Sequence, residues 1–305
     1  MRCHFATPAK FPGRTFHRPH APPHSSLPVP SPAHDEAATV RVASHGWRGR
    51  AARDWAHHFR DADPLDWAHR HHAQPVNDRP VVRTWCLVVD KHVLYLKHFA
   101  GPRDAPGLLD RLRWQVHHRA RRIARTTDRL RAAGFHAPRT ILVARRRRGL
   151  AVEQLLIAEQ MPGRPCAKLL RDPDPARAHA VARAAGDTLA RLHNAGYVHG
   201  EPHLANLLIT PDGQIGWLDN DRTRRRPLLN ARYVRWRNLT RMLRDILRAR
   251  GERTTLRCFL AYARARGLSR RQRRDTWRQL QPQLRAQVRR ARQKALRDAR
   301  AARSR

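Results

Sequence analysis

The segment from Tyr197 to Arg222, YVHGEPHLANLLITPDGQIGWLDNDR, collects side chains that suit phosphoryl transfer. Glu201 lies five residues before Asn206, and Asp219 follows Asn206 by thirteen residues. Carboxylate and amide oxygens can hold Mg²⁺, and a carboxylate near a hydroxyl group can accept its proton. Phosphoryl transfer needs these groups and a cation on the phosphates. The order and spacing therefore predict a phosphate-transfer site rather than a chance hairpin with polar residues.

The candidate for the cation is Lys97, which lies inside the apolar run VLYLKHF. Only five of the 63 basic residues are lysines, so a lysine in a core strand calls for a functional reason. The alternative interpretation is a lysine on the exposed edge of a strand, where it discourages pairing with other chains.

The region around Lys97 is predicted to be rich in strands. The runs VVRTWCLVV and HVLYLKHF predict a hairpin around the polar turn Asp90–Lys91. A helix is predicted over residues 108–133, because apolar residues recur at three- and four-residue intervals and Gly134 can end it. Two further strands are predicted at residues 140–146 and 152–161.

The second half of the chain is predicted to be mainly helical. A helix extends from Pro175 to about Gly196, and NLLI, PDG and IGWLD then predict a short hairpin. Residues beyond 230 carry helical apolar stripes. We therefore predict an α+β fold of two lobes. The predicted domain covers residues 76–268, with a small β-rich N-lobe (76–161) and a helical C-lobe (162–268), followed by a basic helical tail (269–305).

Residues 1–75 differ from the rest in composition. They are rich in Pro, His, Arg and Ala, and apolar residues do not recur with any period. Such a composition predicts a disordered N-terminal extension that packs no core.

The formal net charge of +39 predicts attraction to polyanions, among them nucleic acid, anionic lipid and phosphorylated glycolipid. The four cysteines are far apart and form no CxxC motif, which fits a reducing compartment. No apolar run approaches the roughly 20 residues that span a bilayer. We expect a soluble cytoplasmic protein that contacts a membrane surface at its periphery.

Two strings in the polar segment resemble a known family. His199–Gly200–Glu201 with Asn206 resembles the HGD form of the kinase catalytic loop. The string LDNDR, with the arginine-rich run that follows it, resembles the IDFDR region of the lipopolysaccharide kinase (Kdo/WaaP) family. The resemblance covers roughly residues 80–265. It implies membership of the protein-kinase-like superfamily and the use of ATP and Mg²⁺.

The resemblance also implies roles for individual residues. Lys97 contacts the ATP phosphates, and Glu201 accepts the hydroxyl proton or orients the acceptor. Asn206 and Asp219 bind Mg²⁺. Asp221 supports the metal or orients a neighbouring arginine.

The string EQMPG at residues 159–163 is the expected hinge between the lobes. Its backbone, with Glu159 and Met161, is predicted to meet the adenine. His199 is predicted to pack the catalytic loop rather than to carry a proton.

Three features depart from the kinase pattern. No glycine-rich loop precedes Lys97. The helix lacks a glutamate partner for this lysine, because Ile123 in RARRI stands where the family has a glutamate. Glu153 or Glu159 is the substitute that the sequence offers. Finally, Glu201 stands where a catalytic aspartate belongs, and one extra methylene moves a carboxylate by about 1 Å.

Three functions remain open from the sequence. The first is an ATP-dependent phosphotransferase that resembles the Kdo and heptose kinases and phosphorylates a sugar hydroxyl on an anionic glycolipid or another polyanionic acceptor. The second is a nucleotide-binding pseudokinase that acts as a scaffold. The third is a kinase-like protein associated with nucleic acid.

Overall fold

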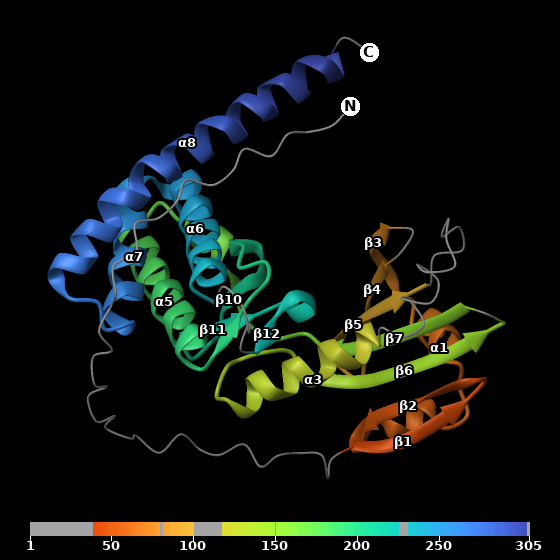
Figure 1. Ribbon diagram of the computed structural model, residues 1–305. Coiled ribbons are helices and arrows are strands. Elements are labelled where there is room, and N and C mark those ends of the chain that lie inside the picture. The colour runs from red at the N-terminus through yellow and green to blue at the C-terminus, as the bar shows by residue number, and fades with distance from the viewer. Residues whose placement is uncertain (1–38, 80–81, 101–117, 150, 226–230, 304–305) are drawn as a thin grey trace. The chain divides into compact units, whose positions relative to one another are not determined.

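The computed structural model describes residues 39–79, 82–100, 118–149, 151–225 and 231–303, which are drawn as coloured ribbon in Figure 1. All of them belong to one compact unit, Ser31–Arg305. A β-rich lobe comes first along the chain and a helical lobe follows, so the predicted two-lobe α+β fold is confirmed.

The N-lobe is built on a seven-stranded antiparallel sheet with the order β1-β2-β6-β7-β5-β4-β3. The β4–β5 hairpin turns at Asp90–Lys91 as predicted. Both residues have positive φ, 46° and 69°, as a tight two-residue hairpin turn of type I′ requires. The strands are β1 (Thr39–Ser44), β2 (Trp47–Ala52), β3 (Gln74–Arg79), β4 (Val82–Val89), β5 (His92–Phe99), β6 (Thr140–Arg148) and β7 (Ala151–Glu159).

Residues 39–75 are folded, so the prediction of a disordered extension over residues 1–75 is wrong for this part. The β1–β2 hairpin pairs with β6, and η1 (Arg53–Phe59) and α1 (Pro64–Arg70) pack beside it. Residues 39–75 bury a few aromatic side chains that do not recur at a regular spacing in the sequence. A search for periodic apolar residues therefore did not predict that this segment folds. These buried residues are Trp47, Trp55, Phe59 and Trp67. Residues 1–38 lie outside the described residues.

A buried polar cluster around Arg146 fastens this hairpin and α1 to the sheet. Its guanidinium pairs with Asp63 at 2.6 Å and with Glu153 at 2.9 Å, and lies 4.5 Å from the centre of the Trp47 ring. Asp63 also accepts hydrogen bonds from Trp47 Nε1 and from the backbone N–H of Leu65 at the start of α1. Burial opposes ionisation of Asp63, but these donors and Arg146 together hold its pKa below the usual value.

Helix α3 (Arg119–Ala132) packs on the sheet through Ile123, which is buried with Phe99 and Leu156, whereas Leu130 is buried in the C-lobe core. The prediction that Ile123 faces the core is therefore confirmed. Gly134 has φ of 77°, the left-handed conformation expected just after a helix end. Residues 108–117 of the predicted helix lie outside the described residues.

The C-lobe core lies between its helices and two short hairpin strands. Leu189, Trp217, Leu243 and Phe259 are fully buried in it. The helices are α4 (Cys166–Leu169), α5 (Pro175–Asn194), α6 (Ala231–Arg250), α7 (Glu252–Ala265) and α8 (Arg270–Arg303). The short strands are β8 (Arg164–Pro165), β9 (Tyr197–Val198), β10 (Leu207–Ile209), β11 (Ile215–Trp217) and β12 (Arg224–Arg225).

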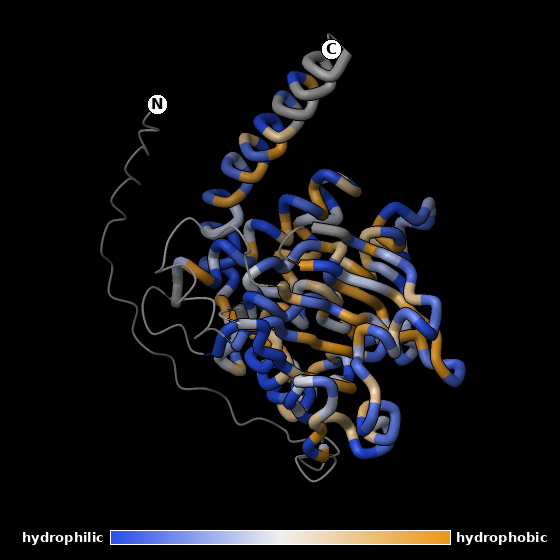
Figure 2. Tube along the Cα trace, turned by 90° about the vertical axis from the view of Figure 1, so that its right-hand side faces the viewer, coloured by the Kyte–Doolittle hydropathy of each residue, from blue (hydrophilic) through white to orange (hydrophobic). Residues whose placement is uncertain are grey.

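Helix α8 corresponds to the basic segment predicted over residues 269–305. Leu280 and Leu284 are buried and join the C-lobe core. The C-terminal half of the helix extends beyond the other helices (Figure 1), and hydrophilic and hydrophobic residues alternate along the part of the helix that is coloured in Figure 2. In the part of the chain that the structure describes, no helix is long and apolar enough to cross a membrane.

We predict that Arg146→Leu lowers the free energy of unfolding by about 3 kcal/mol, because Asp63 and Glu153 lose their shared cation in a buried site. Urea denaturation of the purified variants measures this change. Arg145→Leu is the matched control, since Arg145 is the exposed neighbour on the same strand, and we expect a change within about 0.5 kcal/mol. Equal losses in the two variants would contradict the role assigned to the cluster.

Candidate active site

The segment His199–Asn206, which resembles a kinase catalytic loop and is called the catalytic-type loop here, is held in place by His199. Its side chain is fully buried and stacks on the Trp217 ring with centroids 5.1 Å apart. His199 Nε2 donates to the Leu218 carbonyl, and Nδ1 accepts from the backbone N–H of Glu201. Burial lowers the pKa of His199, which keeps the imidazole neutral and suits this arrangement of donor and acceptor. The geometry thus supports a packing role for His199.

Gly200 allows the loop to approach the segment after Asp219 closely. A Cβ at this position would lie 2.1 Å from Cβ of Arg222 and 2.7 Å from its carbonyl oxygen. The Gly200 carbonyl also accepts a hydrogen bond from Arg241 on α6 at 2.5 Å. The glycine of the HGE string is therefore required by packing, and the loop is fixed from two sides.

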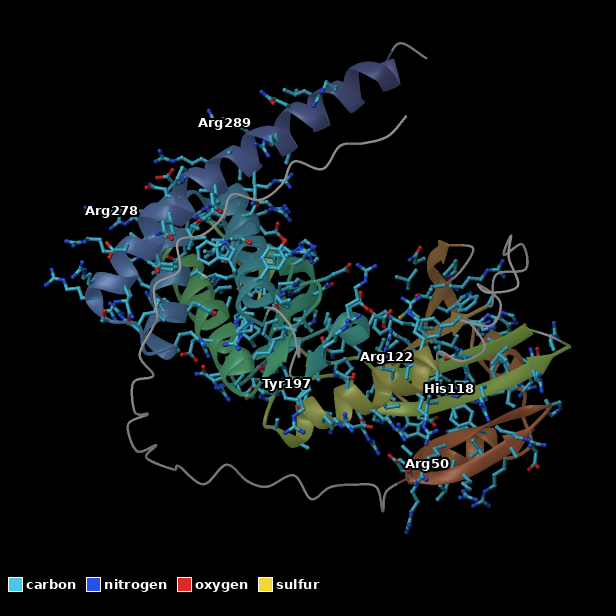
Figure 3. All side chains as sticks on the ribbon, viewed as in Figure 1. Arg50, His118, Arg122, Tyr197, Arg278 and Arg289 are labelled. Atoms are coloured by element: carbon cyan, nitrogen blue, oxygen red, sulfur yellow. The ribbon has the colours of Figure 1, made fainter. Side chains whose placement is uncertain are left out.

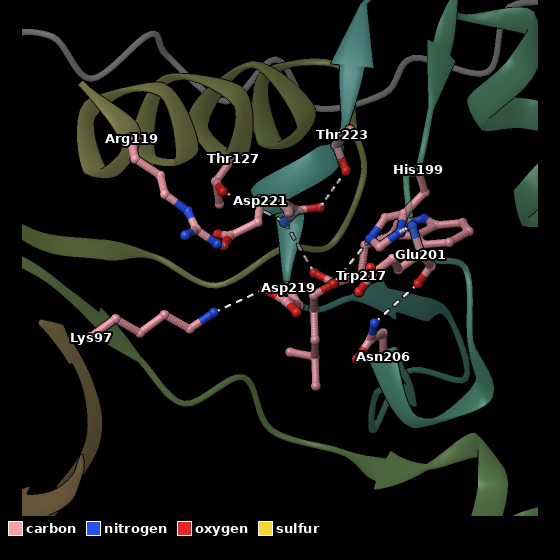
Figure 4. A network of polar contacts seen from close by, with 12 residues as sticks. Lys97, Arg119, Thr127, His199, Glu201, Asn206, Trp217, Asp219, Asp221 and Thr223 are labelled. Carbon is pink, nitrogen blue, oxygen red and sulfur yellow. Dashed lines mark hydrogen bonds and ion pairs between the residues drawn. The ribbon is translucent and has the colours of Figure 1, made fainter. Parts of the chain in front are cut away.

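Asn206 and Asp219 are brought together by the β10–β11 hairpin. The N–H of Leu218 donates to the Asn206 carbonyl at 2.8 Å, which fixes the two strand ends side by side. The Asn206 side-chain amide donates to the Glu201 carbonyl at 3.0 Å, so its amide group is oriented by the catalytic-type loop (Figure 4). One hairpin thus carries both predicted metal ligands.

Lys97 reaches across from β5 and pairs with Asp219, with Nζ 2.9 Å from Oδ1. Asp219 adopts φ of 51°, a left-handed conformation that is uncommon for a residue other than glycine and is enriched in Asp and Asn. Burial opposes its ionisation, but the charge of Lys97 and its hydrogen bond outweigh this effect and hold the pKa of Asp219 below the usual value.

The two glutamates that the sequence offered as partners for Lys97 are engaged elsewhere, so that prediction is wrong. Glu153 pairs with Arg146, and Glu159 pairs with His92 at 2.7 Å. Lys97 pairs instead with Asp219, the carboxylate predicted to bind the metal. A partly buried lysine needs a nearby anion, and the nearest one here comes from the other lobe.

Asp221 lies beside α3 and binds Arg119, with Nη2 2.6 Å from Oδ2. The guanidinium of Arg119 also lies 5.0 Å from the centre of the Phe99 ring. Asn220 donates to Thr127 farther along the same helix, at 3.5 Å. The loop after Asp219, η3 (Asn220–Arg222), is therefore tied to α3 (Figure 4).

Arg119 is a residue that the sequence did not single out. Its only signal was the expectation that Asp221 either supports the metal or orients a nearby arginine. The side chain of Asp221 is 13% exposed, and its second oxygen, Oδ1, is buried without a hydrogen-bond partner. The structure places Asp221 with Arg119, whereas its predicted contribution to the metal remains a prediction.

The predicted hinge lies at the end of β7. The N–H of Gln160 donates to the Val93 carbonyl at 2.8 Å, which joins the hinge to β5. Met161 is buried against β11, since a Cβ on Gly216 would lie 2.3 Å from its Cε. Met161 therefore packs directly under the hairpin that carries Asp219. The adenine contacts predicted for Glu159 and Met161 remain predictions.

The residues fit a magnesium ion that arrives with a nucleotide. In the described part of the chain, no group of three or more His, Cys, Asp and Glu side chains could hold a metal ion. Mg²⁺ in phosphotransferases is typically bound by one or two carboxylates, with phosphate and water oxygens filling the other positions. Asp219 and the amide oxygen of Asn206 match that smaller donor set.

A β-rich lobe and a helical lobe are joined by the pair of Lys97 with Asp219, beside the loop that begins His199–Gly200–Glu201. This combination defines a protein-kinase-like protein. The family model of the lipopolysaccharide kinase (Kdo/WaaP) family matches residues 83–262, and the chain belongs to this family.

Curated relatives agree with this assignment. The chain is 31% identical over 203 residues to a 3-deoxy-D-manno-octulosonic acid kinase of Stenotrophomonas maltophilia (strain K279a), covering 64% of this chain and 78% of that protein. A 3-deoxy-D-manno-octulosonic acid kinase of Xylella fastidiosa (strain M12) is 28% identical over 159 residues, covering 52% of this chain and 62% of that protein.

Among solved structures, the crystal structure of monomeric WbdD matches 52% of this chain and 37% of its own chain, with 18% sequence identity and a TM-score of 0.36.

We predict that Arg119→Leu lowers the free energy of unfolding by about 2 kcal/mol, because Asp221 loses its charged donor in a largely buried position. Urea denaturation measures this loss, and hydrogen exchange should show weaker protection of α3. Arg121→Leu, an exposed position on the same helix, is the control and should change little.

A double-mutant cycle tests the pairing itself. Asp221→Asn should cost less stability in the Arg119→Leu background than in the wild type, because the partner is already gone. Strictly additive losses would show that Arg119 and Asp221 do not act as a pair.

Proposed function

We propose that this chain transfers the γ-phosphoryl group of ATP to a sugar hydroxyl on an anionic glycolipid of the lipopolysaccharide pathway. The observation that carries the proposal is the convergence of Lys97, Asp219, Asn206 and Glu201 around one hairpin and one loop. Membership of a family of lipopolysaccharide kinases and relatives named as sugar-acid kinases support the choice of acceptor.

The donor side of the reaction uses the charges of both lobes. Lys97 binds phosphate oxygens and gives up part of its contact with Asp219 when nucleotide enters. Asp219 and Asn206 would hold Mg²⁺, and the ion would supply positive charge that offsets the charge of the phosphates. The depressed pKa of Asp219 keeps this carboxylate ionised and able to bind a cation at neutral pH.

The acceptor side depends on Glu201. Its backbone N–H is fixed by His199 and its carbonyl by Asn206, so the loop presents the carboxylate in a defined direction. In this structure Oε1 of Glu201 lies 2.7 Å from Arg222 Nη1. For catalysis, Glu201 takes the proton of the attacking hydroxyl or orients that hydroxyl.

The ion pair of Glu201 with Arg222 also favours a second function. Glu201 is paired with Arg222, and its side chain is one methylene longer than that of the expected aspartate. Both features fit a nucleotide-binding pseudokinase that acts as a scaffold, because they displace the carboxylate from its catalytic position. The two functions differ in whether the wild-type chain turns over ATP in the presence of acceptor.

The proposed location is the cytoplasmic face of the inner membrane, with contact at its periphery. Supporting this are the net charge of +39 and the basic side chains that project from α8, among them Arg278 and Arg289 (Figure 3). A basic residue near an anionic leaflet contributes about 1 kcal/mol to binding. Tighter, salt-dependent binding to RNA than to anionic vesicles would instead favour the nucleic-acid-associated function.

We expect purified wild-type chain to transfer labelled γ-phosphate from ATP to lipid A precursors that carry 3-deoxy-D-manno-octulosonic acid. Asp219→Ala should lower the rate at least about 100-fold, because a preorganised charge is lost at the phosphates. Asp212→Ala is the matched control, since Asp212 is an exposed carboxylate in the turn of the same hairpin. We expect it to retain the wild-type rate.

Two results would change the conclusion. Equal transfer by wild type and Asp219→Ala would exclude Asp219 as the metal ligand. Binding of ATP without transfer by the wild type, together with transfer gained in Glu201→Asp, would establish the pseudokinase function instead.

A further inference from the structure

One face of α6 presents an exposed aromatic residue and several arginines. Tyr233, Arg237, Arg241 and Arg244 are separated by four, four and three residues, so they share a face of the helix. The opposite face is buried in the C-lobe core through Leu239, Met242, Leu243 and Ile246. Tyr233 is 59% exposed, and the Arg237 guanidinium lies 5.9 Å from the centre of its ring.

This face meets the catalytic-type loop at Glu201. Arg241 donates to the carbonyl of Gly200, the residue before Glu201, at 2.5 Å. Arg222 pairs with the Glu201 carboxylate from the neighbouring η3 segment at 2.7 Å. Guanidinium groups from two separate elements therefore lie beside the residue that receives the acceptor hydroxyl.

The arginines are crowded more closely than stability alone favours. Like charges four residues apart destabilise a helix, and Arg237 and Arg241 have this spacing. Burial, and then the charge of Arg237, lower the pKa of Arg241, with Arg244 and Arg222 adding to the effect and Glu201 opposing it. A face that concentrates positive charge in this way gains stability when an anion binds to it.

The nearby carboxylates neutralise only part of the positive charge of these arginines, so the remainder can bind an anion. Asp245 is shared between Arg244 and His203, at 3.3 Å and 2.9 Å. The Nε atom of Arg244 is buried and has no hydrogen-bond partner. Arg222 is 70% exposed on its side chain, so its ion pair with Glu201 is weak and exchangeable.

We propose that Arg222, Arg237 and Arg241 form an anion subsite beside Glu201 that binds a carboxylate or phosphate group of the sugar acceptor. Guanidinium groups bind such anions through two parallel hydrogen bonds, which fixes orientation as well as charge. The acceptor's anion takes Arg222 away from Glu201, and the freed carboxylate then faces the hydroxyl. This inference rests on the proposed function, since it assigns the acceptor of the same site.

The test measures binding to the full chain by calorimetry, without ATP. The probes are 3-deoxy-D-manno-octulosonic acid, its uncharged methyl ester, and glucosamine 1-phosphate. We expect the wild type to bind at least one of the two anions about 10- to 100-fold more tightly than the ester, because charged hydrogen bonds are lost in the ester. A preference for the acid assigns the carboxylate, and a preference for glucosamine 1-phosphate assigns the phosphate.

The variants are Arg237→Gln and Arg241→Gln, and each should remove most of the preference for the anion. Arg237 is exposed, so its variant is expected to fold even if Arg241→Gln disturbs the catalytic-type loop. Arg183→Gln on α5 removes an equal charge from an exposed position and should keep the preference. The inference is overturned if acid, phosphate and ester bind equally well, or if both variants keep the wild-type preference.

The binding readout separates this inference from the proposed function. Arginine-dependent binding of an anion without phosphoryl transfer would leave the subsite in place and remove the kinase assignment. Equally fast transfer to acceptors with and without the anionic group would keep the kinase assignment and remove the subsite.

Discussion

The ion pair between Lys97 and Asp219 is the interaction on which the site depends. It joins strand β5, which lies between β7 and β4 in one lobe, to the end of a short hairpin in the other, at 2.9 Å. A lysine in a largely apolar strand is stable only with an anion nearby, and a carboxylate at the end of a buried hairpin needs a cation. Each residue thus meets the requirement of the other. The same two residues are the ones proposed to bind the phosphates and the metal ion.

The attachment of α3 explains how the chain tolerates the loss of the expected helix glutamate. Ile123 fills a core position where the resemblance led us to expect that glutamate, and the helix is instead tied to the loop after Asp219 through Arg119 and Asp221. The expected pattern places an anion, the glutamate, on the helix. Here the helix instead supplies the cation, Arg119, and the loop supplies the anion, Asp221. Because Asp221 follows Asp219 by two residues, the short segment η3 links the position of α3 to that of Asp219.

Charge has two different uses in this chain. Many of the arginines lie on exposed helix faces, where their charge contributes to the electrostatic field around the protein. Around Arg146 and Arg119, by contrast, guanidinium groups are packed on aromatic rings and bind carboxylates directly. Arginine suits this use because its planar group stacks on a ring and still donates several hydrogen bonds. The arginines beside Glu201 lie between these two environments.

The sequence by itself determined the local elements and the polar segment. Strands β4 to β7, the Asp90–Lys91 turn and the spacing of Asn206 and Asp219 were predictable because short-range periodicity and turn chemistry specify them. Tertiary structure alone decided which charges pair. Lys97 and Asp219 are 122 residues apart in the sequence, and Arg119 and Asp221 are 102 residues apart. No local sequence pattern indicates which of the basic residues pairs with a given carboxylate over such separations. It also decided that residues 39–75 fold, because their few aromatic side chains gain a core only against a sheet formed by later strands.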